Sequence, residues 1–198
     1  MFRSLIAVSL AAALAACAPQ QAAVPRTCAI SGLEKVGGPI ALVDEAGKPV
    51  TEAAFAGRPT LLYFGFASCP DVCPTALQTL AKALETRPAG ATPITVALIS
   101  VDPGRDTPEK LAQYVSSDAF PPGTRGFTGT QAQIDAAKTA FRAYASRRDT
   151  PESAMGYVMD HSSLFYLMDG QWRIRALFPS SLAPADMAAC VDAGLAKR

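Results

Sequence analysis

Two cysteines placed between a buried strand and a helix limit the possible folds of this chain more than any other feature. The apolar run Thr60–Phe64 predicts a buried strand, and after Pro74 apolar residues recur at helical spacing as far as Leu84. Proline suits the first turn of a helix, so we expect Cys73 at or beside the N-cap and Cys69 in the preceding loop. A helix N-terminus favours the thiolate, the form of cysteine that binds soft metals and attacks disulfides.

Strand-like and helix-like segments alternate along the rest of the chain. The continuous apolar run Ile94–Val101 predicts a central strand, and strand, crossover helix and strand together imply a parallel sheet. We assign Ser146–Met159, which is rich in charged residues, to a surface loop. With the thiols after the first core strand, the order of elements is a thioredoxin-like α/β layout. The other predicted elements are hairpin strands at 39–44 and 48–50, a helical turn at 51–55, a helix from 107, a strand at 125–128, a helix from 130, strands at 163–168 and 172–178, and a helix at 183–195.

The N-terminal segment has the pattern of a bacterial export signal. A short positive start precedes the apolar run Leu5–Ala16, which is much shorter than the roughly 20 residues of a bilayer-spanning helix. Leu14–Cys17 resembles a lipobox, which implies cleavage before Cys17 and a lipid on its thiol; the alternative is an ordinary cleaved signal with Cys17 a bystander. We predict a signal peptide at 1–16, a lipid anchor and tether at 17–36, and a folded domain at 37–198 on the periplasmic side of a membrane.

The composition is consistent with one compact domain and gives no sign of a nucleic-acid partner. Hydrophobic residues make up 49% of the chain, and 18 Lys and Arg are balanced by 17 Asp and Glu. A nucleic-acid-binding domain normally carries a strongly basic face. We therefore predict no nucleic acid among the partners.

The cysteine pair has the ligand chemistry of a soft metal site but needs a third donor. Side chains four residues apart lie about 5–6 Å apart at Cβ on a helix, close enough for one metal ion. The only histidine, His161, belongs to a segment that the thioredoxin layout places opposite the thiols; the alternative is an ordinary surface or core histidine. Zinc would need a fourth ligand, and Cys28 and Cys190 lack ligand-type spacing. Two sulfurs and one nitrogen suit Cu(I).

Three separated motifs resemble those of the Sco/SenC family of copper-binding proteins. The motifs are Phe64–Pro74, Ile99–Pro103 followed by Arg105–Pro108, and Asp160–Ser162. The resemblance implies a thioredoxin-like fold with an added N-terminal β-hairpin and one copper ion, Cu(I) with Cu(II) left open, held by Cys69, Cys73 and His161. It also implies a metallochaperone that helps to build the binuclear copper centre of cytochrome c oxidase. The implied partners are the copper-binding subunit of the oxidase and a thioredoxin-like reductant or other copper chaperone.

The chain departs from the family pattern at two places. Ala67 stands where members commonly have threonine, two residues before the first cysteine, and this removes a hydroxyl near the site without touching a ligand. Many members are anchored by a membrane-spanning helix, whereas we expect this chain to use a lipid on Cys17. Neither departure changes the predicted ligands.

The cysteine pair also supports a second hypothesis, a thiol-disulfide oxidoreductase in which Cys69 and Cys73 cycle between dithiol and disulfide. Against a general thioredoxin activity stand the three-residue spacing and the lack of a proline directly before the Ser163 strand. A thiol peroxidase ranks last, because Phe66 stands where peroxiredoxins place Thr or Ser. The first two hypotheses are compatible, because a disulfide between the two cysteines cannot bind copper and has to be reduced first.

Two cysteines remain outside the predicted site. If Cys69 and Cys73 are the working pair, Cys28 and Cys190 are left as the candidates for a structural disulfide in an oxidising compartment. The alternative is two unrelated thiols.

Three carboxylates lie close to the predicted ligands in sequence. A hydrogen-bond acceptor often orients a metal-binding imidazole, and Asp160, next to His161, is the favoured candidate ahead of Asp71 and Asp102. Each of the three is equally explained as a turn or cap residue.

Overall fold

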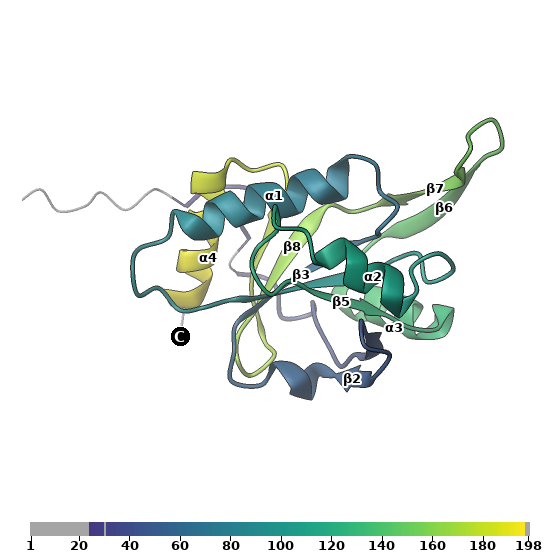
Figure 1. The fold of residues 1–198 in the computed structure, drawn as a ribbon. Helices are drawn as coiled ribbons and strands as arrows, with labels where there is room; N and C mark the ends of the chain where they lie inside the picture. The colour runs from purple at the N-terminus through teal and green to yellow at the C-terminus, as the bar shows by residue number, and fades with distance from the viewer. Residues whose placement is uncertain (1–23, 30, 197–198) are drawn as a thin grey trace, which may run out of the picture.

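The computed structural model describes residues 24–29 and 31–196, which form a seven-stranded sheet with helices packed around it and a separate two-stranded sheet (Figure 1). The strands are β1 Ala41–Asp44, β2 Pro49–Thr51, β3 Thr60–Gly65, β4 Thr95–Ser100, β5 Arg125–Thr128, β6 Ala145–Thr150, β7 Gly156–His161, β8 Leu164–Met168 and β9 Ile174–Pro179. The helices are the short 3-10 helix η1 Glu52–Phe55, α1 Val72–Glu85, α2 Pro108–Val115, α3 Gln131–Phe141 and α4 Pro184–Ala196. The expected signal peptide and Cys17 lie outside the described residues. Within the described ranges, no helix has the length and apolar character needed to cross a bilayer.

The main sheet is built around β3, the strand that precedes the thiols. β3 pairs in parallel with β4, and β4 pairs in parallel with β5. On its other side β3 pairs antiparallel with β8, and β8 pairs antiparallel with β9. At the opposite end of the sheet, β1 of the hairpin β1–β2 pairs antiparallel with β5. The full order is β2-β1-β5-β4-β3-β8-β9. This arrangement confirms the thioredoxin-like α/β fold with an added N-terminal β-hairpin.

Helices cover both faces of the sheet, and the cysteine pair belongs to the face that carries α1. All residues of β3 are buried, so alternate side chains enter two different hydrophobic layers. The Phe64 ring meets Phe141 of α3 at a centroid distance of 5.7 Å. Tyr63 and Gly65 face the other layer, where Cys73 lies and where α1 packs beside α4 (Figure 1). The carboxyl end of β3 therefore leads the chain directly to the first turn of α1.

The prediction of a surface loop at Ser146–Met159 is wrong, because this segment forms most of a two-stranded antiparallel arm, β6–β7. The register pairs Ala145 with His161 and Thr150 with Gly156, and the arm projects from the body of the molecule in Figure 1. Most of β6 is exposed on both faces, and β7 mixes apolar and polar residues, so neither strand has the regular alternation that marks a half-buried strand. Backbone pairing, polar contacts and the packing of Ala145 and Met159 against the core hold the arm.

The start of α1 also differs from the prediction by two residues. The helix begins at Val72, with Asp71 as its N-cap, so Cys73 lies within the first turn and Pro74 follows it. The first turn of a helix has free N–H groups, so proline is tolerated there as well. Both sulfurs still lie beside the helix N-terminus, which favours a thiolate there.

The last part of the expected tether lies against the folded body. Ala29 exchanges two backbone hydrogen bonds with Leu177 of β9, with N···O distances of 2.9 and 2.8 Å. The preceding residue, Cys28, is buried. The chain is therefore held at the β9 edge several residues before Gly37.

We predict that Gly65→Ala destabilises the fold and distorts the site together. A Cβ at this position would lie 2.9 Å from the Tyr63 ring and 3.0 Å from the Cys73 sulfur, both of which are rigidly buried. Overpacking of this kind costs about 1–3 kcal/mol of unfolding free energy, measurable by urea denaturation. As a control, Gly104→Ala adds a Cβ with no neighbour nearer than 3.9 Å, so the prediction fails if the two variants lose equal stability.

Candidate metal centre

Three side chains from distant parts of the chain converge at the end of β3. Cys69 comes from the loop after β3, Cys73 from the first turn of α1, and His161 from the last position of β7. One ligand atom from each lies within 4.8 Å of the others, and the Cys73 sulfur is 3.5 Å from His161 Nε2. The structure thus brings together the three ligands predicted from the sequence.

The interaction between the two cysteine side chains, helped by the backbone N–H groups at the helix N-terminus, divides the pair into a thiolate and a thiol. The Cys73 N–H donates to the Cys69 sulfur across 3.3 Å. Hydrogen bonds from the Cys73 side chain, from His161 and from backbone N–H groups lower the pKa of Cys69 to about 4, against the opposing effect of burial. The same hydrogen bond with Cys69, together with full burial, raises the pKa of Cys73. Cys69 therefore carries the negative charge of the reduced pair.

The imidazole of His161 is oriented by the backbone. Its Nδ1 lies 3.1 Å from the carbonyl oxygen of Ser162, which can only accept a hydrogen bond, so the ring proton belongs on Nδ1. Nε2 faces the sulfurs, where it can donate to the Cys69 thiolate when it carries a proton and offers its lone pair to a metal ion when it does not. The rings of Tyr63 and Phe66 meet the imidazole edge-on, at centroid distances of 6.1 and 5.8 Å, and enclose it on the protein side.

The three carboxylates considered from the sequence do not contact the imidazole through any hydrogen bond found among the described residues. Asp160 is exposed, and Arg148, 2.9 Å away, lowers the pKa of its carboxyl. Asp71 accepts a hydrogen bond from the Thr75 hydroxyl at the start of α1. Asp102 is buried and binds other residues of the β4–α2 loop and the arm.

A buried carboxylate, that of Asp106, fixes the loop that carries Cys69. Asp106 accepts hydrogen bonds from the Ala67 N–H at 3.0 Å and from the Ser100 hydroxyl at 2.7 Å, and burial raises its pKa. Lys110 donates to the Ser68 hydroxyl at 2.6 Å. These contacts set the backbone immediately before the first cysteine. The motif Arg105–Pro108 contains this carboxylate, but nothing in the sequence showed that Asp106 would bind the backbone of the loop before Cys69.

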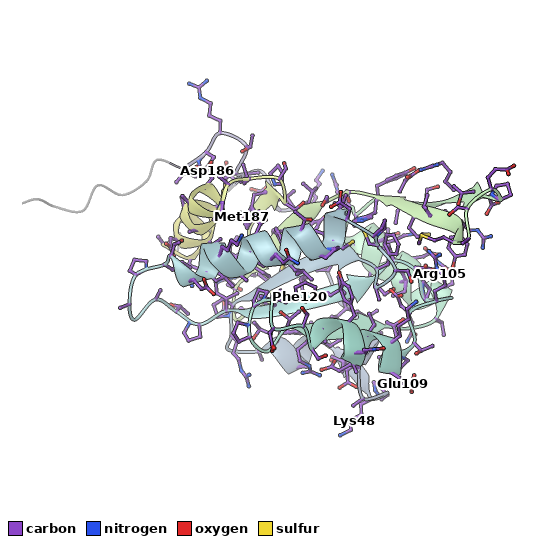
Figure 2. The ribbon with its side chains drawn as sticks, turned by 45° about the horizontal axis from the view of Figure 1, so that its top comes forward. Lys48, Arg105, Glu109, Phe120, Asp186 and Met187 are labelled. Carbon is purple, nitrogen blue, oxygen red and sulfur yellow. The ribbon has the colours of Figure 1, made fainter. Side chains whose placement is uncertain are left out.

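A stack of charged and aromatic side chains, Asp102, Arg105, Tyr157 and Arg147, joins the arm to the body; we call it the arm clamp. The Arg105 and Arg147 guanidinium carbons lie 3.7 and 3.9 Å from the centre of the Tyr157 ring, so they occupy opposite faces. Asp102 forms an ion pair with Arg105 at 2.5 Å and accepts a hydrogen bond from the Tyr157 hydroxyl at 2.8 Å. Figure 2 labels Arg105 where the arm meets the body. Nothing in the sequence pattern predicts this clamp, because Tyr157 belongs to the segment that we expected to be a loop.

The donor set fits one soft metal ion. Metal bonds of about 2.0–2.3 Å to nitrogen and sulfur hold ligand atoms no more than about 4.5 Å apart, so the 4.8 Å cluster needs only a small contraction. One donor is already a thiolate, and the imidazole presents a free lone pair. Among the described residues no fourth cysteine, histidine or carboxylate joins the group, which favours a three-coordinate ion over closed tetrahedral zinc.

The remaining cysteines also lie together. Cys28, beside the β9 edge, and Cys190, on the buried face of α4, are both free thiols in this structure and lie close enough for each to affect the pKa of the other. Burial raises the pKa of both. They are remote in sequence from the metal cluster and do not belong to it.

Comparison with known proteins identifies close relatives of this fold and site. The family model described as SCO1/SenC matches residues 29–196. Protein SenC of Rhodobacter capsulatus is 40% identical over 139 residues, which are 70% of this chain and 61% of that protein, so the chain covers less than two thirds of SenC.

Two solved structures are similar over most of the chain. Arabidopsis thaliana ScoI with copper bound has 32% identity and a TM-score of 0.76, covering 82% of this chain and 99% of that one. Bradyrhizobium japonicum ScoI with copper bound has 39% identity and a TM-score of 0.68, covering 79% of this chain and 98% of that one.

We predict that Arg105→Met loosens the arm. The change keeps an apolar stem but removes the ion pair with Asp102 and the contact with the Tyr157 ring, and a partly buried cation–π contact contributes about 1–2 kcal/mol. Amides of β6 and β7 should exchange with deuterium about tenfold faster, while those of β3 stay unchanged. Asp149→Ala, which removes an exposed partner of Arg147, is the control and should leave the rates near wild type. Equal exchange in all three proteins would contradict the clamp.

We predict that Cys69 of the reduced, metal-free protein reacts as a thiolate at acidic pH. Because its pKa is about 4, its alkylation by iodoacetamide should be nearly constant from pH 8 to 6 and should decline only as the pH falls toward 4. In Cys73→Ala the largest cause of the lowered pKa is absent, so the decline should move to higher pH. Peptide mass spectrometry gives the rates. A wild-type rate that rises about tenfold per pH unit through pH 7 would show an ordinary thiol.

Proposed function

Because the chain belongs to the SCO1/SenC family, we propose that it binds one copper ion through Cys69, Cys73 and His161 and delivers it during assembly of the binuclear copper centre of cytochrome c oxidase. The observation that carries the proposal is the convergence of these three ligand atoms within 4.8 Å. Relatives solved with copper bound, from Arabidopsis thaliana and Bradyrhizobium japonicum, support copper as the metal.

Each of the three proposed ligands contributes a different property to holding and releasing the ion. The buried Cys73 and the backbone-oriented His161 present a sulfur and a nitrogen lone pair, and Cys69 supplies the charge that neutralises Cu(I). Thiolates select Cu(I) over harder divalent ions, and a three-donor site leaves room for an incoming ligand. The receiving protein is then one that offers its own thiolates, in agreement with the copper-binding subunit of the oxidase.

A disulfide between Cys69 and Cys73 would abolish the donor set, so the proposal includes a reductant. A dithiol of the thioredoxin type would attack the disulfide, pass through a mixed disulfide and leave as a disulfide itself, returning two thiols to this protein. The two electrons and the protons come from that partner. A copper donor acts on the protein after this step.

One observation favours a second function, thiol-disulfide exchange. One cysteine of the pair is a thiolate and the other a buried thiol, and this asymmetry is the one that lets a protein thiol attack a disulfide. The oxidase cysteines or other extracytoplasmic proteins are the substrates that this alternative implies.

We propose further that the protein works on the periplasmic side of a bacterial membrane, held by a lipid on Cys17. The apolar N-terminal run and the lipobox-like Leu14–Cys17 support this location. An oxidising compartment would also allow Cys28 and Cys190 to form a disulfide. The proximity of these two thiols supports that bond, which would fasten the start of the domain to α4.

We predict that His161→Ala weakens Cu(I) binding by at least about 100-fold, because it removes one of three ligands. Competition with a Cu(I) chelator under anaerobic conditions measures the affinity. Asp149→Ala, a change on the exposed face of the same arm, should bind like wild type. Undiminished affinity of His161→Ala would exclude the proposed site.

The same variant separates the two functions. If the protein acts mainly as an oxidoreductase, His161→Ala should reduce a model disulfide substrate at the wild-type rate even though it no longer holds copper. If delivery of copper is the function, this variant should fail to load a Cu-free oxidase fragment while Asp149→Ala succeeds.

We predict a lipid on Cys17 and a bond between Cys28 and Cys190 in protein purified from its own membranes without reductant. Trypsin should release a lipidated peptide 17–26 and a linked pair of peptides 27–35 and 176–197, visible by mass spectrometry and separated by dithiothreitol. Cys17→Ser should move the protein out of the membrane fraction. Two unlinked peptides, or an unmodified 17–26, would contradict the corresponding part of the proposal. A closed disulfide should add about 2–4 kcal/mol of stability.

A further inference from the structure

Two side chains from the segment that joins β4 to α2 and from α2 itself hold the loop that leads to Cys69. Asp106 is 0% exposed, and its Oδ2 accepts a hydrogen bond from the Ala67 N–H at 3.0 Å. Lys110, in the first turn of α2, donates to the Ser68 hydroxyl at 2.6 Å. The two residues directly before Cys69 are therefore both tied to the same neighbouring part of the chain.

The segment that carries Asp106 is itself fixed to the centre of the sheet. The Ser100 hydroxyl, at the end of β4, donates to Asp106 Oδ2 at 2.7 Å and accepts from the Asp102 N–H at 3.0 Å. The Asp106 N–H donates to the Asp102 carbonyl oxygen at 3.0 Å. Ser100 pairs in the parallel register with Gly65, the last residue of β3. Buried hydrogen bonds of this kind rigidify the residues that they join, so Ala67 is held relative to the two central strands.

The position of this loop affects the distance between the two sulfurs. Cys69 and Cys73 are free thiols in the structure, and Cys73 is fully buried in the first turn of α1. A disulfide needs an S–S bond of about 2.05 Å. Because Cys73 is part of the helix, closing this bond has to move Cys69 and the loop before it. Contacts that hold the loop in its present place therefore stabilise the dithiol relative to the disulfide.

We propose that Asp106 is a positioning residue of the cysteine pair, which acts together with the Lys110–Ser68 contact to hold the loop where the two sulfurs stay apart. The role requires an acceptor oxygen rather than a charge, because Oδ2 makes both side-chain hydrogen bonds and Oδ1 has no partner among the described residues. The same placement leaves both sulfurs free to bind one metal ion. The consequence for the metal rests on the proposed copper function, whereas the consequence for the dithiol does not.

The test uses variants that separate the acceptor oxygen from the charge. Asp106→Ala removes both, whereas Asp106→Asn keeps an oxygen for the Ala67 N–H and removes only the charge. Ser68→Ala removes the acceptor of Lys110 without changing any charge, and it decides the matter if Asp106→Ala does not fold. Tyr114→Phe, the control, removes a buried hydroxyl of α2 that has no hydrogen-bond partner among the described residues. Circular dichroism shows which variants are folded.

The metal-free measurement is the equilibrium with glutathione, in which two glutathione thiols become glutathione disulfide as the Cys69–Cys73 disulfide becomes two thiols. Asp106→Ala should shift this equilibrium about fivefold toward the protein disulfide, the effect of one net hydrogen bond. Ser68→Ala should shift it in the same direction by less. Asp106→Asn and Tyr114→Phe should match wild type.

The direction of the shifts separates positioning from charge. A negative charge on Asp106 disfavours a thiolate on Cys69, so a role through charge would move both Asp106 variants toward the dithiol instead. The inference is overturned if Asp106→Asn shifts as far as Asp106→Ala in either direction, or if Ser68→Ala equilibrates like wild type.

Copper provides the second readout. A loop that is no longer held presents less preorganised ligands, so Asp106→Ala should bind Cu(I) about fivefold more weakly in competition with a chelator, while Asp106→Asn should bind like wild type. A wild-type protein that binds no copper would overturn the proposed function, while the glutathione equilibrium would still decide the role of Asp106.

Discussion

The site depends on the hydrogen bond from the Cys73 N–H to the Cys69 sulfur, made where β3 passes the chain to α1. A helix leaves its first N–H groups without carbonyl partners, and a sulfur placed at that end is drawn toward the thiolate form. The second sulfur, in the first turn of the helix and fully buried, remains a thiol because two adjacent negative charges would repel one another. A single piece of local geometry thus gives two identical side chains different chemistry.

The third ligand is held at the site by contacts of a different kind from those that hold the cysteines. His161 lies at the end of an arm whose residues are at most half-buried, with only Ala145 and Met159 packed against the core, so burial of apolar area contributes little to holding it in place. The arm clamp adds a guanidinium–ring stack and an ion pair, contacts worth a few kcal/mol at most. The sulfurs therefore belong to the rigid core, whereas the imidazole belongs to the part of the site that opens most easily.

The sequence predicted the features that leave a local pattern. The apolar runs of β3 and β4, the helix after the cysteines and the capping box at Thr130 and Gln133 are all present in the structure. The unique histidine and the thioredoxin-like order pointed to the third ligand, and the resemblance to the Sco/SenC family completed the predicted ligand set. The arm was missed because β6 is charged and exposed along most of its length and β7 has no regular alternation of apolar and polar residues. The contact of Asp106 with Ala67 and the hydrogen bond between the Tyr63 and Ser163 hydroxyls were missed because tertiary packing alone brings these residues together, across 39 and 100 positions of sequence.

The burial of the ligands sets the order in which a bound ion could change hands. A Cβ on Gly65 would lie 3.0 Å from the Cys73 sulfur, so this sulfur is enclosed from the sheet side and an incoming ligand has no path to it there. Cys69 is 9% exposed, and His161 lies at the end of the arm. Under the proposed function, a partner thiolate would therefore displace His161 or Cys69 first, and the bond to Cys73 would be the last to break.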